Sequence, residues 1–133
     1  MVVGEQYAIE TFASTGEGYV NERGDNSHFM IRPKSLHHRP SLAKAQHVMG
    51  IIRKHHKTLA FCQRFLWRHC DRSIIPTPES LNAVLNFLTR QGKQPLRDYP
   101  PLCDVPGSMT SQMEHTLFIR NSGLEVITRG PDY

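Results

Sequence analysis

Two glutamates, Glu10 and Glu114, are the residues of this 133-residue chain best suited to chemistry. Each lies in a run of apolar and β-branched residues that favours a β-strand. A carboxylate among apolar residues is costly to bury unless a partner compensates its charge. That partner is a metal ion in a catalytic setting and a buried Arg or Lys in a structural one. From position alone, a solvent-facing glutamate on an edge strand is the simpler interpretation of Glu10.

If the two strands are neighbours, their carboxylates would repel unless cations lie between them. Divalent ions held in this way lower the pKa of a bound water and stabilise a tetrahedral intermediate. Glutamate oxygens suit cobalt, manganese, iron or zinc. The pair therefore indicates metal-assisted hydrolysis.

Strands are expected toward both ends of the chain. They are predicted at residues 6–15, at Tyr19-Val20 after a Gly16–Gly18 turn, at 27–31, at 111–120 and, as a hairpin return, at 124–128. Because side chains alternate along a strand, Ala8, Glu10 and Phe12 share one face. Gln112, Glu114, Thr116 and Phe118 share one face of the later strand.

Three helices are expected in the middle of the chain. Helical periodicity predicts them over residues 42–57, over residues 59–70 with Phe61, Phe65 and Leu66 inward, and from Pro78 onward. The third helix has Leu81, Val84, Leu85 and Leu88 on its buried face, and Gly92 is its expected C-cap.

Composition is that of a soluble globular protein, with 38% hydrophobic and 21% charged residues. Three cysteines exclude a fully paired disulfide framework, and their spacing shows no zinc motif. The sequence has neither a signal peptide nor a membrane-spanning apolar run. A cytoplasmic protein without a membrane partner is expected.

Charge is unevenly distributed. No Asp or Glu occurs between Asn26 and Cys70, whereas this stretch holds nine Lys or Arg residues and seven of the eight histidines. Such a block can attract RNA or a ribosome. A solvated helix surface is the simpler interpretation, because no aromatic interleaving or groove-reading motif is evident. A helix-turn-helix DNA reader is a competing interpretation of the same helices.

Several segments together resemble type 2 methionine aminopeptidases. They are Ala8–Gly18 (AIETFASTGEG), Thr58–Cys62 (TLAFC), Tyr99–Asp104 (YPPLCD), Gln112–Thr116 (QMEHT) and Arg129–Tyr133 (RGPDY). They follow the family's order at about its spacing, and the resemblance covers the C-terminal portion of a family member.

The resemblance implies an α+β, partial pita-bread fold with antiparallel strands at both ends and an inserted three-helix, winged-helix-like subdomain. Residues 1–31 and 98–133 would belong to the catalytic domain, and residues 32–97 would form the insertion. A complete enzyme of this kind holds two divalent metal ions and removes the initiator methionine from nascent polypeptides. A non-catalytic RNA- or ribosome-binding protein derived from this fold is the alternative.

The resemblance also implies roles for single residues. Glu10 would bind one metal and Glu114 would bridge both, while Phe12 would wall the methionine pocket. His28 would act beside the substrate, and Ala60 and Tyr99 would line the pocket.

The family's two aspartates and its ligand histidine fall upstream of this sequence. Asp25 and His115 are present but do not match those ligand positions. We therefore expect this chain alone to bind metal weakly and to leave methionine uncleaved. We also expect it to expose strand edges and apolar surface.

Overall fold

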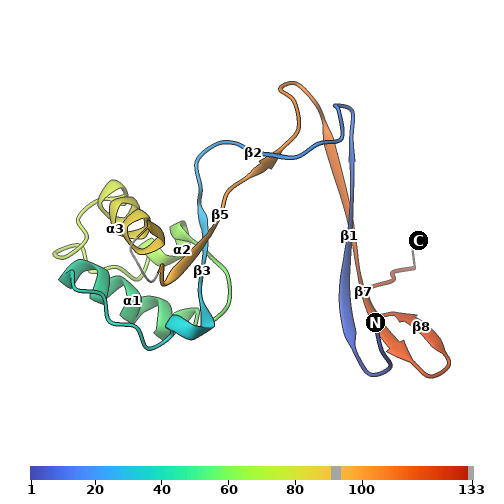
Figure 1. Ribbon diagram of the computed structural model, residues 1–133, viewed down its shortest axis with the longest axis horizontal. Helices are drawn as coiled ribbons and strands as arrows, with labels where there is room; N and C mark the ends of the chain where they lie inside the picture. The colour runs from blue at the N-terminus through green and yellow to red at the C-terminus, as the bar shows by residue number, and fades with distance from the viewer. Residues whose placement is uncertain (91–93, 132–133) are drawn as a thin grey trace. The chain divides into compact units, whose positions relative to one another are not determined.

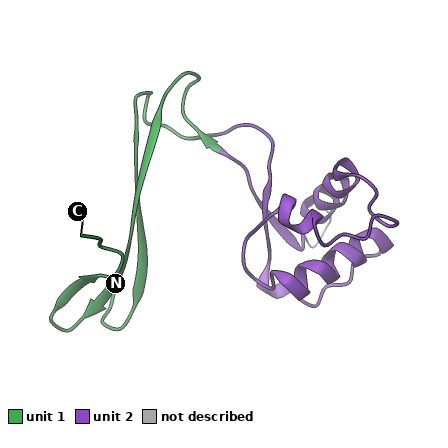
Figure 2. Cartoon of the chain, turned by 180° about the vertical axis from the view of Figure 1, so that it is seen from behind, with its two compact units in different colours: residues 1–21, 102–133 green, residues 22–101 purple. Residues whose placement is uncertain are grey.

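The computed structural model describes residues 1–90 and 94–131, which form two compact units (Figure 2). The strand unit contains Met1–Asn21 and the segment from Leu102 onward, and the helical unit contains Glu22–Pro101. Each unit is described by itself below.

The strand unit is an antiparallel sheet with the order β1-β7-β8, formed by β1 (Gln6–Ser14), β7 (Thr110–Arg120) and β8 (Gly123–Val126) (Figure 1). β1 pairs with β7 along its whole length, so the first and last predicted strands are neighbours. The predicted hairpin return is confirmed, because β8 pairs with β7.

The prediction of a strand at Tyr19-Val20 is wrong. Both residues are exposed, and the next strand is β2 (Asn21–Glu22), which pairs with β6 (Leu102–Cys103). After the turn, the chain continues into β2, and its pairing with β6 takes the place of a hairpin with β1.

The helical unit combines three helices with a small antiparallel sheet of order β4-β3-β5. Its strands are β3 (His28–Ile31), β4 (Phe61–Cys62) and β5 (Leu96–Tyr99). Its helices are α1 (Ala43–His55), α2 (Gln63–Trp67) and α3 (Pro78–Arg90), and the 3-10 turn η1 (Pro33–Ser35) precedes α1.

One hydrophobic core lies between these helices and strands. It is built by Ala45, Val48, Met49 and Ile52 of α1, the predicted face of α3 (Leu81, Val84, Leu85, Leu88), and Phe29, Ile31 and Leu96 of the sheet, among others. Alternation along β3 places Phe29 and Ile31 in the core and leaves His28 exposed. The predicted C-cap Gly92 lies outside the described residues.

The predicted helix over residues 59–70 is much shorter in the structure. Phe61 and Cys62 pair with β3, so their backbone groups are used in the sheet and the helix begins only at Gln63. Phe61 and Leu66 are buried as predicted, but Phe65 is 43% exposed and belongs to the surface.

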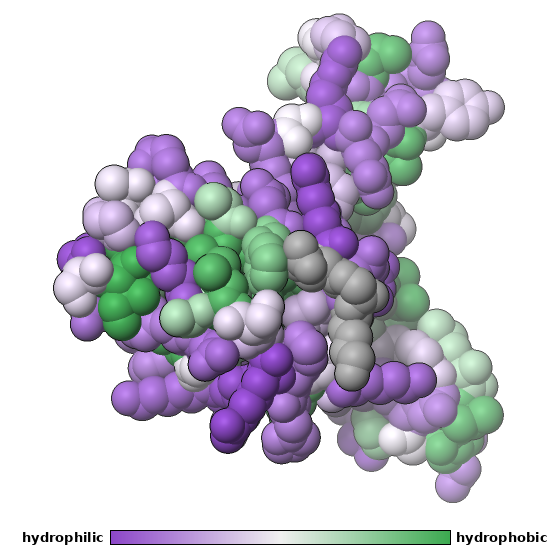
Figure 3. Space-filling view, turned by 60° about the vertical axis from the view of Figure 1, so that its left-hand side comes forward, coloured by the Kyte–Doolittle hydropathy of each residue, from purple (hydrophilic) through white to green (hydrophobic). Residues whose placement is uncertain are grey.

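The strand unit has no core of its own. Over its described residues, 1–21 and 102–131, none is buried, and Phe12 and Met113 are 70% and 64% exposed. The predicted exposure of apolar surface is therefore present. Hydrophobic residues also gather in patches on the face of the chain seen in Figure 3.

The architecture is a mixed helix and strand fold with antiparallel sheets. The compact helical unit spans Glu22–Pro101, and within it β3 and β5 pair with each other. In the described part of the chain, every helix is too short or too polar to cross a bilayer.

Candidate functional site

Glu10 and Glu114 lie directly opposite each other in the β1–β7 ladder. Residues paired across antiparallel strands point to the same face and have Cβ atoms about 4.5–5.5 Å apart. Two like charges in this position destabilise the pair unless something compensates them. The structure thus brings together two glutamates that are separated by most of the sequence.

Phe12 shares this face, because it lies two residues beyond Glu10 and pairs with Gln112. The side-chain amide of Gln112 donates a 2.5 Å hydrogen bond to Oε1 of Glu10. His115 pairs with Ile9 and therefore points to the opposite face from Glu114.

The carboxylate pair is exposed, which agrees with the simpler interpretation of Glu10 as a solvent-facing residue on an edge strand. β1 is an edge strand of the described sheet, and Glu10 and Glu114 both face solvent. The desolvation cost that would demand a cation is therefore absent from the strand unit by itself.

The donor set fits part of a metal centre. Two carboxylates that face each other across a ladder can share a divalent cation, since hard cations prefer oxygen ligands. Within the residues that the structure describes, no group of three or more His, Cys, Asp or Glu side chains is arranged to hold a metal ion. The two glutamates would therefore provide an incomplete ligand set.

A hollow of about 250 Å³ lies in the strand unit beside Phe12. It is lined by Phe12, Ala13, Ser14, Gly18, Val20, Leu102, Asp104 and Thr110. Most of these groups are apolar, so the hollow suits a hydrophobic side chain. Phe12, the predicted wall of a methionine pocket, is thus beside a cavity in the strand unit.

Asp104 organises the turn beside this hollow and was not singled out from the sequence. Its carboxylate accepts hydrogen bonds from Ser14 Oγ (2.6 Å) and from the backbone N–H groups of Glu17 (3.1 Å), Gly18 (2.9 Å) and Val105 (2.7 Å). These donors, with Ser14 the largest cause, lower the pKa of Asp104 to about 2. No local pattern signals this contact, because Asp104 is 86–90 residues away from its partners Ser14, Glu17 and Gly18 along the chain.

His28 heads a second group of predicted site residues, in the helical unit. It pairs with Cys62 on one side and with Tyr99 on the other, so the three residues form one row across the sheet. Nδ1 of His28 lies 3.0 Å from Ser27 Oγ, and the Tyr99 hydroxyl lies 3.6 Å from the sulfur of Met30. Ala60 lies directly before β4, the strand that contains Cys62.

The stretch between Asn26 and Cys70, which is rich in Lys and Arg, carries an exposed aromatic ring where the helical periodicity predicted a buried one. The guanidinium carbons of Arg64 and Arg68 lie 5.5 Å and 5.1 Å from the centre of the exposed Phe65 ring. Such distances are typical of cation–π contacts. Aromatic interleaving is therefore present in the basic block, because the short α2 leaves Phe65 on the surface.

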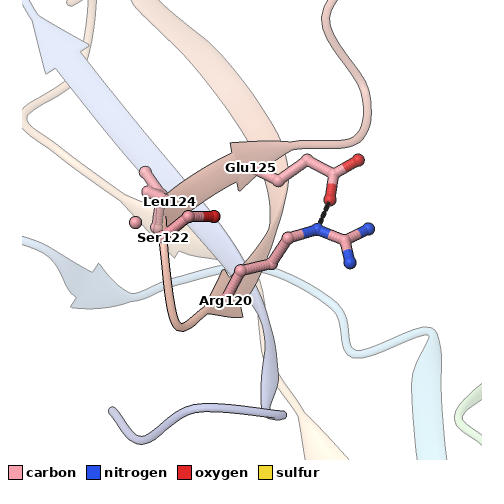
Figure 4. Close-up of a pocket in the computed structure, with 5 residues that line it drawn as sticks. Arg120, Ser122, Leu124 and Glu125 are labelled. Carbon is pink, nitrogen blue, oxygen red and sulfur yellow. Dashed lines mark hydrogen bonds and ion pairs between the residues drawn. The ribbon is translucent and has the colours of Figure 1, made fainter.

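A further hollow, of about 270 Å³, lies at the β7–β8 turn (Figure 4). Arg120 and Glu125 form an ion pair across it. Because both charges are satisfied by each other, this hollow offers little to a charged ligand.

Comparison with solved structures finds a protein of similar fold. A solved structure of a thermophilic Arx1 matches 99% of this chain with a TM-score of 0.74 at 16% identity, and the match spans 32% of that chain. This likeness concerns the fold alone, which in Arx1 is the pita-bread fold. No family model matches the chain.

The chain is also similar in sequence to curated relatives. The chain is 42% identical to methionine aminopeptidase 2-1 of Neosartorya fischeri and 43% identical to methionine aminopeptidase 2 of Laccaria bicolor, in each case over its whole length. It is 42% identical over 97% of its length to methionine aminopeptidase 2 of Kluyveromyces lactis. The resemblance to type 2 methionine aminopeptidases is confirmed, and the chain corresponds to 28%–35% of the length of these relatives.

Proposed function

We propose that this chain supplies part of the active site of a dimetal methionine aminopeptidase, which removes the initiator methionine from nascent polypeptides in the cytoplasm. The observation that carries the proposal is the direct pairing of Glu10 with Glu114 on one face of the β1–β7 ladder. The relatives named methionine aminopeptidase 2 support it, because their similarity spans the whole chain.

In the proposed site, Glu10 would hold one divalent ion and Glu114 would be a ligand shared by both, with cobalt, manganese, iron or zinc as candidates. When bound, such ions lower the pKa of a water molecule and polarise the scissile carbonyl. Phe12 contacts the methionine side chain. His28 positions the substrate and takes part in the proton transfers of the reaction, while Ala60 and Tyr99 line the pocket.

The helical unit is the proposed winged-helix-like subdomain. The packing of α1 and α3 against β3 and β5 supports a positioning role for the His28–Tyr99 row, because it holds this row on a packed sheet. A substrate pocket needs such support, since misplacement of about 1 Å can reduce catalysis by about a hundredfold.

A chimera tests the proposal directly. This chain should replace the matching segment of the Laccaria bicolor methionine aminopeptidase 2, and cleavage of a Met-Ala-Ser peptide with added cobalt or manganese should be measured. We expect the chimera to cleave the peptide. Glu10→Gln and Glu114→Gln should each reduce kcat/KM by about a hundredfold or more, because each removes a charged ligand.

Glu125→Gln is the matched control. It makes the same chemical change in the same sheet but removes only the ion pair with Arg120. Glu125 lies on β8, where it pairs with Phe118 and not with either glutamate of the proposed site. A chimera that folds and cleaves equally well with Glu10→Gln would contradict the proposal.

The isolated chain should leave the same peptide intact. Two carboxylates alone hold two ions weakly, so we expect millimolar-class manganese binding that Glu114→Gln abolishes, measured by the electron paramagnetic resonance of free manganese. Peptide cleavage by these 133 residues alone would show that this expectation is wrong.

RNA or ribosome binding is a second candidate function, favoured by Phe65 between Arg64 and Arg68. Exposed aromatic rings beside cations stack on bases of single-stranded nucleic acid and contribute about 1–3 kcal/mol per base. Phe65→Leu should therefore weaken the binding of a uridylate 12-mer by tenfold or more, as followed by fluorescence anisotropy. Tyr19→Leu, an exposed ring in the strand unit, is the control.

Salt dependence separates this function from simple adhesion. For single strands, the logarithm of the binding constant falls with the logarithm of salt concentration by about 0.7 for each phosphate contact. An RNA binding constant that changes neither with salt concentration nor in Phe65→Leu would contradict this second candidate.

A further inference from the structure

A polar hollow of about 210 Å³ in the helical unit is lined by none of the site residues assigned above. It is lined by Arg39, Pro40, Gln46 and Arg53. Gln46 and Arg53 are seven residues apart on α1, so they lie on the same side of the helix, two turns from each other. Arg39 and Pro40 come from the segment between η1 and α1.

Arg53 is held in a fixed position at this hollow. Its Nε donates a 2.5 Å hydrogen bond to the Leu36 carbonyl oxygen, and its Nη2 donates to the His38 carbonyl oxygen. A guanidinium has five N–H groups, so these two bonds leave three for a ligand. The side chain is therefore ordered before any ligand arrives, which reduces the entropy cost of binding.

Gln46 is fixed in the same way. Its side-chain amide nitrogen donates a 2.9 Å hydrogen bond to the carbonyl oxygen of Pro40. This bond joins the first turn of α1 to the segment that carries Arg39. Two walls of the hollow are thus tied to each other by hydrogen bonds.

The charge of the hollow is positive and uncompensated. Its lining includes two guanidinium groups and no carboxylate, and no Asp or Glu occurs between Asn26 and Cys70 in the sequence. Within the part of the chain that the structure describes, neither Arg39 nor Arg53 forms an ion pair with an acidic side chain. Arg39 is exposed.

We propose that this hollow is an anion site that binds a phosphate group. Planar guanidinium groups match the oxygen geometry of phosphate and form charge-assisted hydrogen bonds with it. Arg53 supplies a pre-ordered fork of donors, and Arg39 closes on the anion from the other wall. The phosphate group can be free or part of a nucleic-acid backbone, and the inference depends on neither function proposed above.

The experiment uses the complete 133-residue chain in solution. Sodium phosphate is titrated against sodium chloride at matched ionic strength, and binding is followed by NMR. We expect saturable shifts of the Arg39 and Gln46 backbone amides and of the Arg53 side-chain Nε–H with phosphate but not with chloride. Arg39→Gln should weaken phosphate binding by about tenfold or more, because a charge-assisted hydrogen bond contributes about 1.5–3 kcal/mol.

Lys44→Gln is the matched control. It removes the same charge from the exposed side of the first turn of α1 but does not line the hollow. Arg39 is exposed, so its replacement should leave the fold intact, which the Trp67 emission and the amide spectrum will verify.

A second arm, with a uridylate 12-mer, distinguishes the sources of the phosphate group. If Arg39→Gln weakens RNA binding as well, the ligand is a backbone phosphate; if phosphate binds and RNA does not, the ligand is a small phosphate. Both outcomes support the site. Equal phosphate binding by Arg39→Gln and Lys44→Gln, or the absence of saturable phosphate binding, would overturn it.

Discussion

Asp104 illustrates how one side chain organises a turn. Its carboxylate joins the end of β1 and the following turn to the segment before β7, through Ser14, Glu17 and Gly18. The bonds favour the ionised form, so they lower the pKa of Asp104 to about 2.

The first prediction concerns the acid sensitivity of this turn. Because the folded pKa lies below the usual value of 3.8, the stabilisation is fully present above pH 3.8 and is lost as the pH falls through about 2. The NMR shifts of the Glu17 and Gly18 amides should titrate together near pH 2. In Asp104→Asn this titration should be missing, and a Gly18 amide that titrates near pH 4 in the natural chain would contradict the assignment.

The second prediction concerns His56. Its ring stacks on Phe61 at 4.8 Å, and its Nε2 is buried without a hydrogen-bond partner in the structure. Burial, followed by the neighbouring His55 and His69, lowers the pKa of His56. The neutral form is therefore favoured by folding, and its contribution to stability is present above pH 6.5 and lost as the pH falls through the lower folded value.

Denaturant unfolding followed by Trp67 emission measures this effect. The helical unit should lose stability between pH 7 and pH 5, and His56→Phe should reduce this loss because it keeps the stack and removes the titrating group. An unchanged pH dependence in His56→Phe would assign the effect to His55, whose pKa is also lowered, chiefly by burial.

At the scale of elements, two glycines predict opposite outcomes for the same substitution. A Cβ on Gly50, within α1, meets no atom within 4 Å, so Gly50→Ala should stabilise the helical unit by about 0.5–1 kcal/mol. A Cβ on Gly16 would lie 2.6 Å from the Asp104 carboxylate. Gly16→Ala should therefore displace Asp104 and loosen the turn, which would be seen as the loss of the acid titration described above.

A further prediction concerns the contribution of helix α3 to the stability of the helical unit. Leu85 is fully buried, and Leu85→Ala should destabilise the helical unit by about 2–5 kcal/mol through the cavity that it leaves. Leu59→Ala, at a residue 72% exposed in the same unit, should change the free energy of unfolding by about 0.5 kcal/mol or less. Urea unfolding of both variants would provide the comparison.

At the scale of the whole molecule, the two units should differ in stability. The core lies in the helical unit, whereas no described residue of the strand unit is buried. Local stability follows buried apolar contacts, so the amides of β1 and β7 should exchange with solvent much faster than those of α1 and α3. Hydrogen exchange followed by mass spectrometry measures this, and equal protection in both units would show that the strand unit is stabilised in another way.

Much of the fold could be predicted from periodicity. The alternation of β1 and β7 and the buried face of α3 are local patterns, and the structure confirms them. The failures occurred where a distant segment changed the local outcome. Phe61 and Cys62 join β3 and leave the predicted helix. Tyr19 and Val20 lead into β2, which pairs with β6 and not with β1.

The sequence by itself determined which side chains carry chemistry and which face of each strand they share, because side-chain direction follows from the two-residue period. Only the tertiary structure decided that Glu10 faces Glu114, that Asp104 holds the turn after β1, and that Arg39 and Arg53 line one hollow. The first two contacts join residues distant along the chain, and the third depends on how the segment before α1 packs against that helix. Strand pairing and packing set these arrangements, which no local pattern contains.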